Sequence, residues 1–72
     1  MTLGAELRKA RNGAGLSQEE LAHRAGIDRS NLSEIETDKK SPNLETLFRI
    51  TEALGVSAAK IVARIEKARH GD

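Results

Sequence analysis

Four polar side chains near the middle of the chain have the chemistry needed to read the edges of DNA bases. They are Arg29, Ser30, Asn31 and Glu34. Arginine can bond guanine O6 and N7 with two parallel hydrogen bonds, asparagine can bond adenine N6 and N7, and glutamate can accept from cytosine N4. The alternative is an ordinary solvated helix surface, because exposed polar residues are common. Which interpretation is better depends on the elements that hold these residues.

A second set of side chains could hold DNA phosphates. It comprises Gln18, Ser33, Lys39 and Lys40. Gln18 begins a predicted helix, where backbone N–H groups and the helix dipole favour an anion. Lys39 and Lys40 follow the next predicted helix and could reach phosphates, which would position the protein without selecting a sequence. A solvated surface position is an equally good interpretation of Gln18 and of the two lysines.

Two short helices joined by a three-residue corner would position both sets. The apolar spacing predicts helices over 18–25 and about 29–37, separated by Gly26-Ile27-Asp28. The core-facing residues of this pair would be Leu21, Ala22, Ala25, Leu32 and Ile35. The small side chain of Ala22 suits the point where two steeply crossed helices approach most closely. This arrangement is the helix-turn-helix, and it makes base reading the better interpretation of residues 29–34.

One three-residue pattern recurs at three corners of the chain. Its copies are Gly15-Leu16-Ser17, Gly26-Ile27-Asp28 and Gly55-Val56-Ser57. The glycine can take the left-handed conformation that ends a helix, and the Ser or Asp can cap the next one. Leu21, Leu32 and Ile61 lie five positions beyond the central apolar residues, where each can complete a hydrophobic staple. Ser17 and Glu20 also have the spacing of a capping box.

The remaining apolar positions predict three more helices, over about 2–14, from 43 or 44 to 54, and over 58–69. Pro42 disfavours a helical residue at position 41. The predicted buried faces are Leu3, Leu7 and Ala10; then Leu44, Leu47, Ile50 and Leu54; then Ile61, Val62, Ile65 and Ala68. No segment alternates like a strand. The predicted fold is all-α, a compact five-helix bundle that forms a single domain over 1–72 with its core over about 3–62.

Composition excludes several classes of protein. The absence of cysteine excludes disulfides and thiolate metal sites, and it fits a reducing compartment. No apolar run is long enough for a membrane span or a signal peptide, so we expect a cytoplasmic protein. His23 and His70 have no second ligand at chelating spacing, so no metal or other cofactor is expected. Nothing supports Ser–His or Cys–His catalysis, and we expect no enzyme. The net charge of +1 leaves DNA binding open.

Two segments together resemble the Cro/CI repressor-like helix-turn-helix family, also called the XRE family. They are LSQEELAHRAGIDRSNLSEIE and SPNLETLFRITEALGVS, and the resemblance extends from about Leu3 to Val62. It implies a five-helix domain that binds operator DNA as a dimer. In such a complex Gln18 would contact a phosphate, and base edges would be contacted by Arg29, Ser30, Asn31 and Glu34. The chain departs from the family at Thr37-Asp38, where Asn-Gly or Arg-Gly is common. Asp38 would add negative charge near the expected path of the phosphates.

Arg11 and Glu36 are predicted to form a structural ion pair that ties the base-reading helix to the rest of the domain, and the resemblance supports this pairing. The chain is similar to stand-alone members of the family, including controller proteins of restriction–modification systems, in which terminal helices form the dimer. The predicted dimer interface is Val56, Ala59, Ile61, Val62 and Ile65. Alternatively, the domain core uses this whole stripe.

The sequence therefore predicts a homodimeric transcriptional regulator that binds a palindromic operator in double-stranded DNA. An alternative is an antitoxin-like subunit that binds a partner protein and also binds DNA. A third interpretation, a purely structural helical bundle, leaves the polar start of the helix over about 29–37 unexplained.

Overall fold

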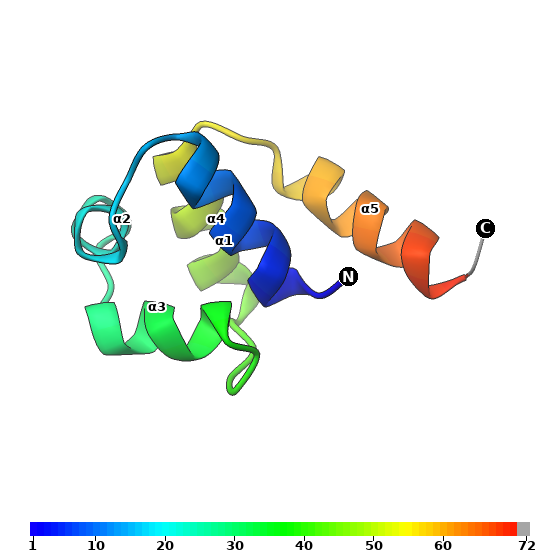
Figure 1. Cartoon of the computed structure of the whole chain (residues 1–72), viewed down its shortest axis with the longest axis horizontal. Helices are drawn as coiled ribbons and strands as arrows, with labels where there is room; N and C mark the ends of the chain where they lie inside the picture. Colours follow the sequence, from blue (N-terminus) through cyan, green and yellow to red (C-terminus); the bar gives the residue numbers. More distant parts are fainter. Residues whose placement is uncertain (71–72) are drawn as a thin grey trace.

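The computed structural model describes residues 1–70, which form five α-helices and no strand (Figure 1). The helices are α1 (Leu3–Gly13), α2 (Gln18–Ala25), α3 (Arg29–Glu36), α4 (Leu44–Leu54) and α5 (Ala58–Arg69). The prediction of an all-α fold is confirmed, and each helix end lies within one residue of its predicted position. The last two residues of the predicted domain, Gly71 and Asp72, lie outside the described residues. No helix within 1–70 is long and apolar enough to cross a membrane.

The three glycine corners share one backbone geometry. Gly15, Gly26 and Gly55 have φ values of 73°, 71° and 72°. After each glycine, the next backbone N–H donates to a carbonyl five residues earlier, as the bond from Ile27 to Ala22 O at 3.0 Å shows. This pattern satisfies carbonyls that a helix C-terminus would otherwise leave without partners. The corners are therefore set by local sequence.

The residues that follow these glycines differ from the prediction at two points. Ser17 and Ser57 accept capping hydrogen bonds, and Ser17 forms the predicted capping box with Glu20. Asp28 stands at the N-cap of α3 in extended conformation, but its exposed carboxylate accepts no capping bond within residues 1–70. Val56 is 39% exposed instead of packing as the third staple residue.

The core lies where α1, α2, α3, α4 and the first half of α5 meet. Its buried apolar residues are Leu7, Leu21, Ala22, Ala25, Leu32, Ile35, Leu47, Ile50 and Ile61. α2 packs against α3 and α4, and α1 packs against α3. Figure 1 shows α2 and α3 at one end of the molecule and the end of α5 at the other.

Two apolar stripes are less buried than predicted. Leu44 is 65% exposed because it is the first residue of α4, where no described helix covers it. On α5, Ile61 is in the core and Ile65 is half-buried, whereas Val62 and Ala68 are exposed. α5 is thus attached to the bundle mainly through its first half, and its second half extends away from the other helices (Figure 1).

The start of α1 lies very close to the end of α3. A Cβ at Gly4 would meet the carbonyl oxygens of Ile35 and Glu36, the second at 2.7 Å. Asp38, with φ of 61°, lies in the left-handed region just beyond α3. Its carboxylate accepts from the Gly4 N–H at 3.0 Å and from the Thr2 hydroxyl at 2.7 Å. The carboxylate of Asp38 therefore binds the N-terminal turn of α1, a structural role that the sequence did not reveal.

Candidate nucleic-acid interface

The predicted base-reading residues lie on the first two turns of α3. Arg29, Ser30 and Glu34 are exposed, and Asn31 is half-buried. The Asn31 Oδ1 atom is buried and has no hydrogen-bond partner within residues 1–70. A bond to both N6 and N7 of adenine requires the amide oxygen and nitrogen together, so Asn31 must rotate before it can make that contact.

A hollow of about 450 Å³ opens beside the start of α2. It is lined by Arg11, Ser17, Gln18, Glu19 and Arg29. The structure thus brings Gln18 of the predicted phosphate set next to Arg29 of the predicted base-reading set. Within residues 1–70, the backbone N–H groups of Gln18 and Glu19 have no acceptor. Such N–H groups at a helix start are suited to bind an anion.

The capping box fixes the first turn of α2. The Ser17 N–H donates to Glu20 Oε1 at 2.9 Å, and the Glu20 N–H donates to Ser17 Oγ at 3.0 Å. Hydrogen bonding of the Glu20 carboxylate to the Ser17 backbone N–H, and to a lesser extent to the Ser17 side chain, holds the pKa of Glu20 below its ordinary value of 4.5, and Arg24 adds a smaller lowering. The box uses two N–H groups and leaves those of Gln18 and Glu19 facing outward.

Arg11 and Glu36 form a buried ion pair between α1 and the end of α3. Arg11 Nε donates to Glu36 Oε2 at 2.8 Å and Nη2 donates to Oε1 at 3.0 Å, with side chains only 11% and 1% exposed. Arg11 Nη1 also donates to the carbonyl of Leu16 at 2.8 Å. The pair predicted from the sequence is therefore present, and it also fixes the segment that leads into α2.

Gln18 takes part in the same network. Its Nε2 atom donates to Glu36 Oε1 at 3.0 Å. Sequence reasoning missed this bond because the two residues are 18 positions apart and no local pattern relates them. One amide of the predicted phosphate set is thus already held by the protein.

In the part of the chain that the structure describes, the side chains of the other members of that set make no hydrogen bond or ion pair. Ser33 is half-buried on α3. Lys39 and Lys40 are exposed, and their backbone N–H groups both donate to the carbonyl of Glu34, which closes the end of α3. The two lysine side chains therefore extend from a turn directly beyond α3.

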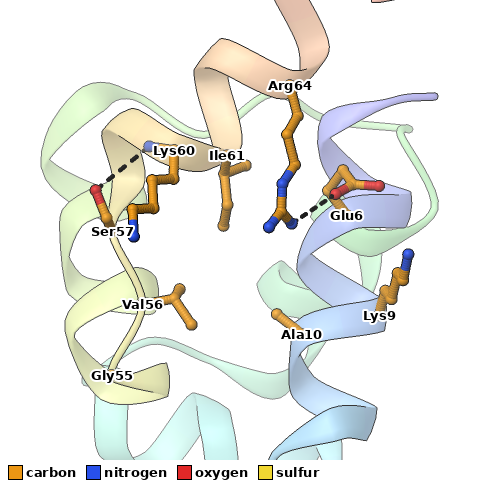
Figure 2. A pocket seen from close by; sticks show the side chains of 9 residues that line it. All are labelled: Glu6, Lys9, Ala10, Gly55, Val56, Ser57, Lys60, Ile61 and Arg64. Atoms are coloured by element: carbon orange, nitrogen blue, oxygen red, sulfur yellow. Dashed lines mark hydrogen bonds and ion pairs between the residues drawn. The ribbon is translucent and has the colours of Figure 1, made fainter.

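A second hollow, of about 460 Å³, lies between α1 and the start of α5 (Figure 2). Its lining includes Glu6 and Ala10 of α1, Val56, and Lys60 and Arg64 of α5. Arg64 Nη1 reaches to 3.7 Å from Glu6 Oε1, and Glu6 is buried. No lining residue comes from α2 or α3, so this hollow is separate from the candidate interface. Within residues 1–70, no group of His, Asp or Glu could hold a metal ion.

The predicted dimer residues divide into two groups. Val56, Ala59 and Val62 are exposed and Ile65 is half-buried. Ile61 is only 4% exposed and belongs to the core of its own chain, so its assignment to a dimer interface is wrong. An apolar side chain that completes one core cannot also cover a partner.

The chain belongs to the helix-turn-helix family, whose model matches residues 7–61. This match includes the whole of α2, α3 and α4. By class, it is a helix-turn-helix protein of the Cro/CI repressor-like type, as the two quoted segments indicated.

Two relatives illustrate the similarity in sequence. The immunity repressor protein of Bacillus phage phi105 is 39% identical over 62 residues, which are 86% of this chain and 43% of that protein. The HTH-type transcriptional regulator ImmR of Bacillus subtilis (strain 168) is 32% identical over 72 residues, which are 100% of this chain and 57% of ImmR. The chain spans about half the length of these relatives. Both are named as a repressor or a regulator, in agreement with the prediction of a protein that is not an enzyme.

Two solved structures have the same arrangement of helices. The restriction-modification controller protein C.AhdI from Aeromonas hydrophila has a TM-score of 0.80 and 32% identity, over 82% of this chain and 89% of that one. SinR, the master regulator for biofilm formation, solved in complex with DNA, has a TM-score of 0.81 and 31% identity, over 85% of this chain and 98% of that one. The predicted five-helix, lambda repressor-like fold is therefore confirmed.

Proposed function

We propose that this chain is a transcriptional regulator of the cytoplasm that binds a palindromic operator as a homodimer. In this proposal, residues 1–72 form one DNA-binding domain with its core over about 3–62. α3 lies in the major groove, and the start of α2 lies against the DNA backbone. The observation that carries the proposal is the hollow at the start of α2, which joins unbonded N–H groups and Gln18 to Arg29 at the start of α3.

The two sets of side chains then have different roles. Arg29, Ser30, Asn31 and Glu34 read base edges, which gives specificity. Gln18, Ser33, Lys39 and Lys40 contact phosphates, which fixes the position of the domain on the duplex. The exposure of Arg29, Ser30 and Glu34 supports the first role, and the exposed lysines directly after α3 support the second.

A homodimer is proposed because one recognition helix reads only a few base pairs. Two copies related by a two-fold axis read two half-sites about one turn of DNA apart, or ~34–36 Å. The proposed interface is Val56, Ala59, Val62 and Ile65. Val62 supports this choice, since an apolar side chain with 46% exposure on a helix that projects from the bundle is suited to contact a second copy.

Selection of bound sequences from a pool of random duplex DNA would test the proposal. The expected result is an enriched palindrome, whose two halves give the half-site and whose spacing gives the dimer geometry. Enrichment of DNA without any shared motif would exclude sequence-specific recognition. A motif without symmetry would exclude the two-fold dimer while retaining base reading.

A further inference from the structure

We infer that Glu36 is a positioning residue for Gln18, which it holds in the orientation that presents a side-chain N–H to a DNA phosphate. This inference rests on the proposed function, because it requires the start of α2 to meet the DNA backbone. It assigns Glu36 a role beyond the ion pair with Arg11. The role depends on three hydrogen bonds that converge on one carboxylate.

The geometry fixes which end of the Gln18 amide faces inward. Glu36 Oε1 accepts from Arg11 Nη2 and from Gln18 Nε2, each at 3.0 Å, while Oε2 accepts from Arg11 Nε at 2.8 Å. An ionised carboxylate can only accept, so Gln18 must present its NH₂ group to Glu36 and not its carbonyl. That NH₂ group has two hydrogens. One is used by Glu36, and the second remains for an acceptor in the hollow that Gln18 lines.

Arg11 offsets the negative charge of Glu36, which would otherwise disfavour a DNA phosphate nearby. A lone Glu36 would repel the anion, but the two-pronged contact from Arg11 balances its charge. Glu36 is almost completely buried and does not line the hollow, whereas Arg11, its ion-pair partner, does. The pair can therefore orient Gln18 without adding net negative charge at the helix start.

Orientation before binding strengthens the contact. A free glutamine side chain loses conformational entropy when a phosphate fixes it, and Gln18 has lost much of that freedom already. Lys39 and Lys40 have exposed side chains with no ion pair or side-chain hydrogen bond within residues 1–70. The contribution of Gln18 to DNA binding should therefore depend on Glu36, and the contribution of Lys40 should not.

The test replaces the buried pair as a unit, as Arg11→Met/Glu36→Met. Replacement of a buried ion pair by apolar side chains of similar volume is often tolerated, and it removes the acceptor of Gln18 together with the bond from Arg11 to the Leu16 carbonyl. In the wild-type background, Gln18→Ala should weaken binding to any duplex by about 10–150-fold, the effect of one hydrogen bond to a charged group. In the Met/Met background, the same substitution should weaken binding by less than about twofold, whereas Lys40→Ala should cost the same in both backgrounds.

A second readout uses the free protein. The two side-chain amide protons of Gln18 should have NMR chemical shifts displaced from those of an unstructured peptide in the wild type, and these shifts should move to the peptide values in the Met/Met variant. An equal cost of Gln18→Ala in both backgrounds would overturn the positioning role and leave the proposed function intact. Gln18 amide-proton shifts equal to those of an unstructured peptide in the wild-type spectrum would overturn it as well, even if the double variant did not fold. Failure of the wild type to bind DNA in a salt-sensitive way would instead overturn the proposed function.

Discussion

At the scale of single residues, Arg29 is the strongest candidate for direct base recognition. It is exposed at the first position of α3 and borders the hollow that contains Gln18. Arg29→Ala should weaken binding to the selected operator by about 1–3 kcal/mol and relax the preference at one base pair. Fluorescence anisotropy with the operator and its single-base variants measures both effects. Arg69→Ala, at the last residue of α5, is the control and should change neither. Unchanged affinity and selectivity in Arg29→Ala would exclude base reading by this residue.

A pair of glycines on α1 allows a matched test of close packing. A Cβ at Gly4 would meet backbone oxygens at the end of α3, whereas a Cβ at Gly13 meets nothing within 4 Å. Gly4→Ala should therefore destabilise the fold by about 1–3 kcal/mol, although alanine favours a helix. Gly13→Ala should stabilise it by up to about 1 kcal/mol. Urea unfolding of both variants measures the difference, and equal effects would show that α1 and α3 are not in tight contact at Gly4.

At the scale of elements, the capping box of α2 links stability to pH. Glu20 has a pKa below its ordinary value of 4.5 because it accepts the Ser17 N–H. A lowered acid pKa adds stability that is complete above the unfolded-state value and is lost as the pH falls through the folded-state value. Glu20→Gln should therefore destabilise the protein at pH 7 and have a smaller effect at pH 3. Urea unfolding at both pH values is the measurement, and a pH-independent difference would contradict this linkage.

The helices could be predicted from the sequence because their ends depend on neighbouring residues. Glycine conformations, the Ser17–Glu20 box and the apolar spacing are all local. Contacts between separate helices could not be predicted from the sequence in the same way. Asp38 caps α1 from 34 residues away in the sequence, and Gln18 reaches Glu36 across 18 residues. The exposure of Leu44 depends on which helix covers the start of α4, and spacing along one helix does not contain that information.

In the candidate site too, some features could be predicted from the sequence and others could not. Residue types and the two-helix pattern identified the four base-reading candidates and the Arg11–Glu36 pair. Only the structure shows that Arg29 and Gln18 line one hollow, that the side-chain Oδ1 atom of Asn31 is buried, and that Ile61 belongs to the core. Each of these depends on distances between separate helices, for which one sequence carries no direct signal.

At the scale of the whole molecule, α5 is the element proposed to join two copies. Val62→Glu would place a charge on the exposed apolar surface of α5, where burial against a partner would be costly. We expect this variant to be monomeric in sedimentation equilibrium and to lose more affinity for a two-half-site operator than for a single half-site. Ala63→Glu, exposed on the same helix and outside the proposed interface, should stay dimeric. An unchanged dimer in Val62→Glu would place the interface elsewhere.

The projecting second half of α5 also has a consequence for how the molecule fluctuates. Beyond Ile65, every described side chain on this helix is exposed, so little tertiary packing opposes its opening. Amide hydrogens over 66–70 should exchange with solvent deuterium almost as fast as those of an isolated helix, while those of Leu32 and Ile35 should exchange only when the whole chain unfolds. Slow exchange over 66–70 at high concentration and fast exchange on dilution would show that a second copy orders this segment.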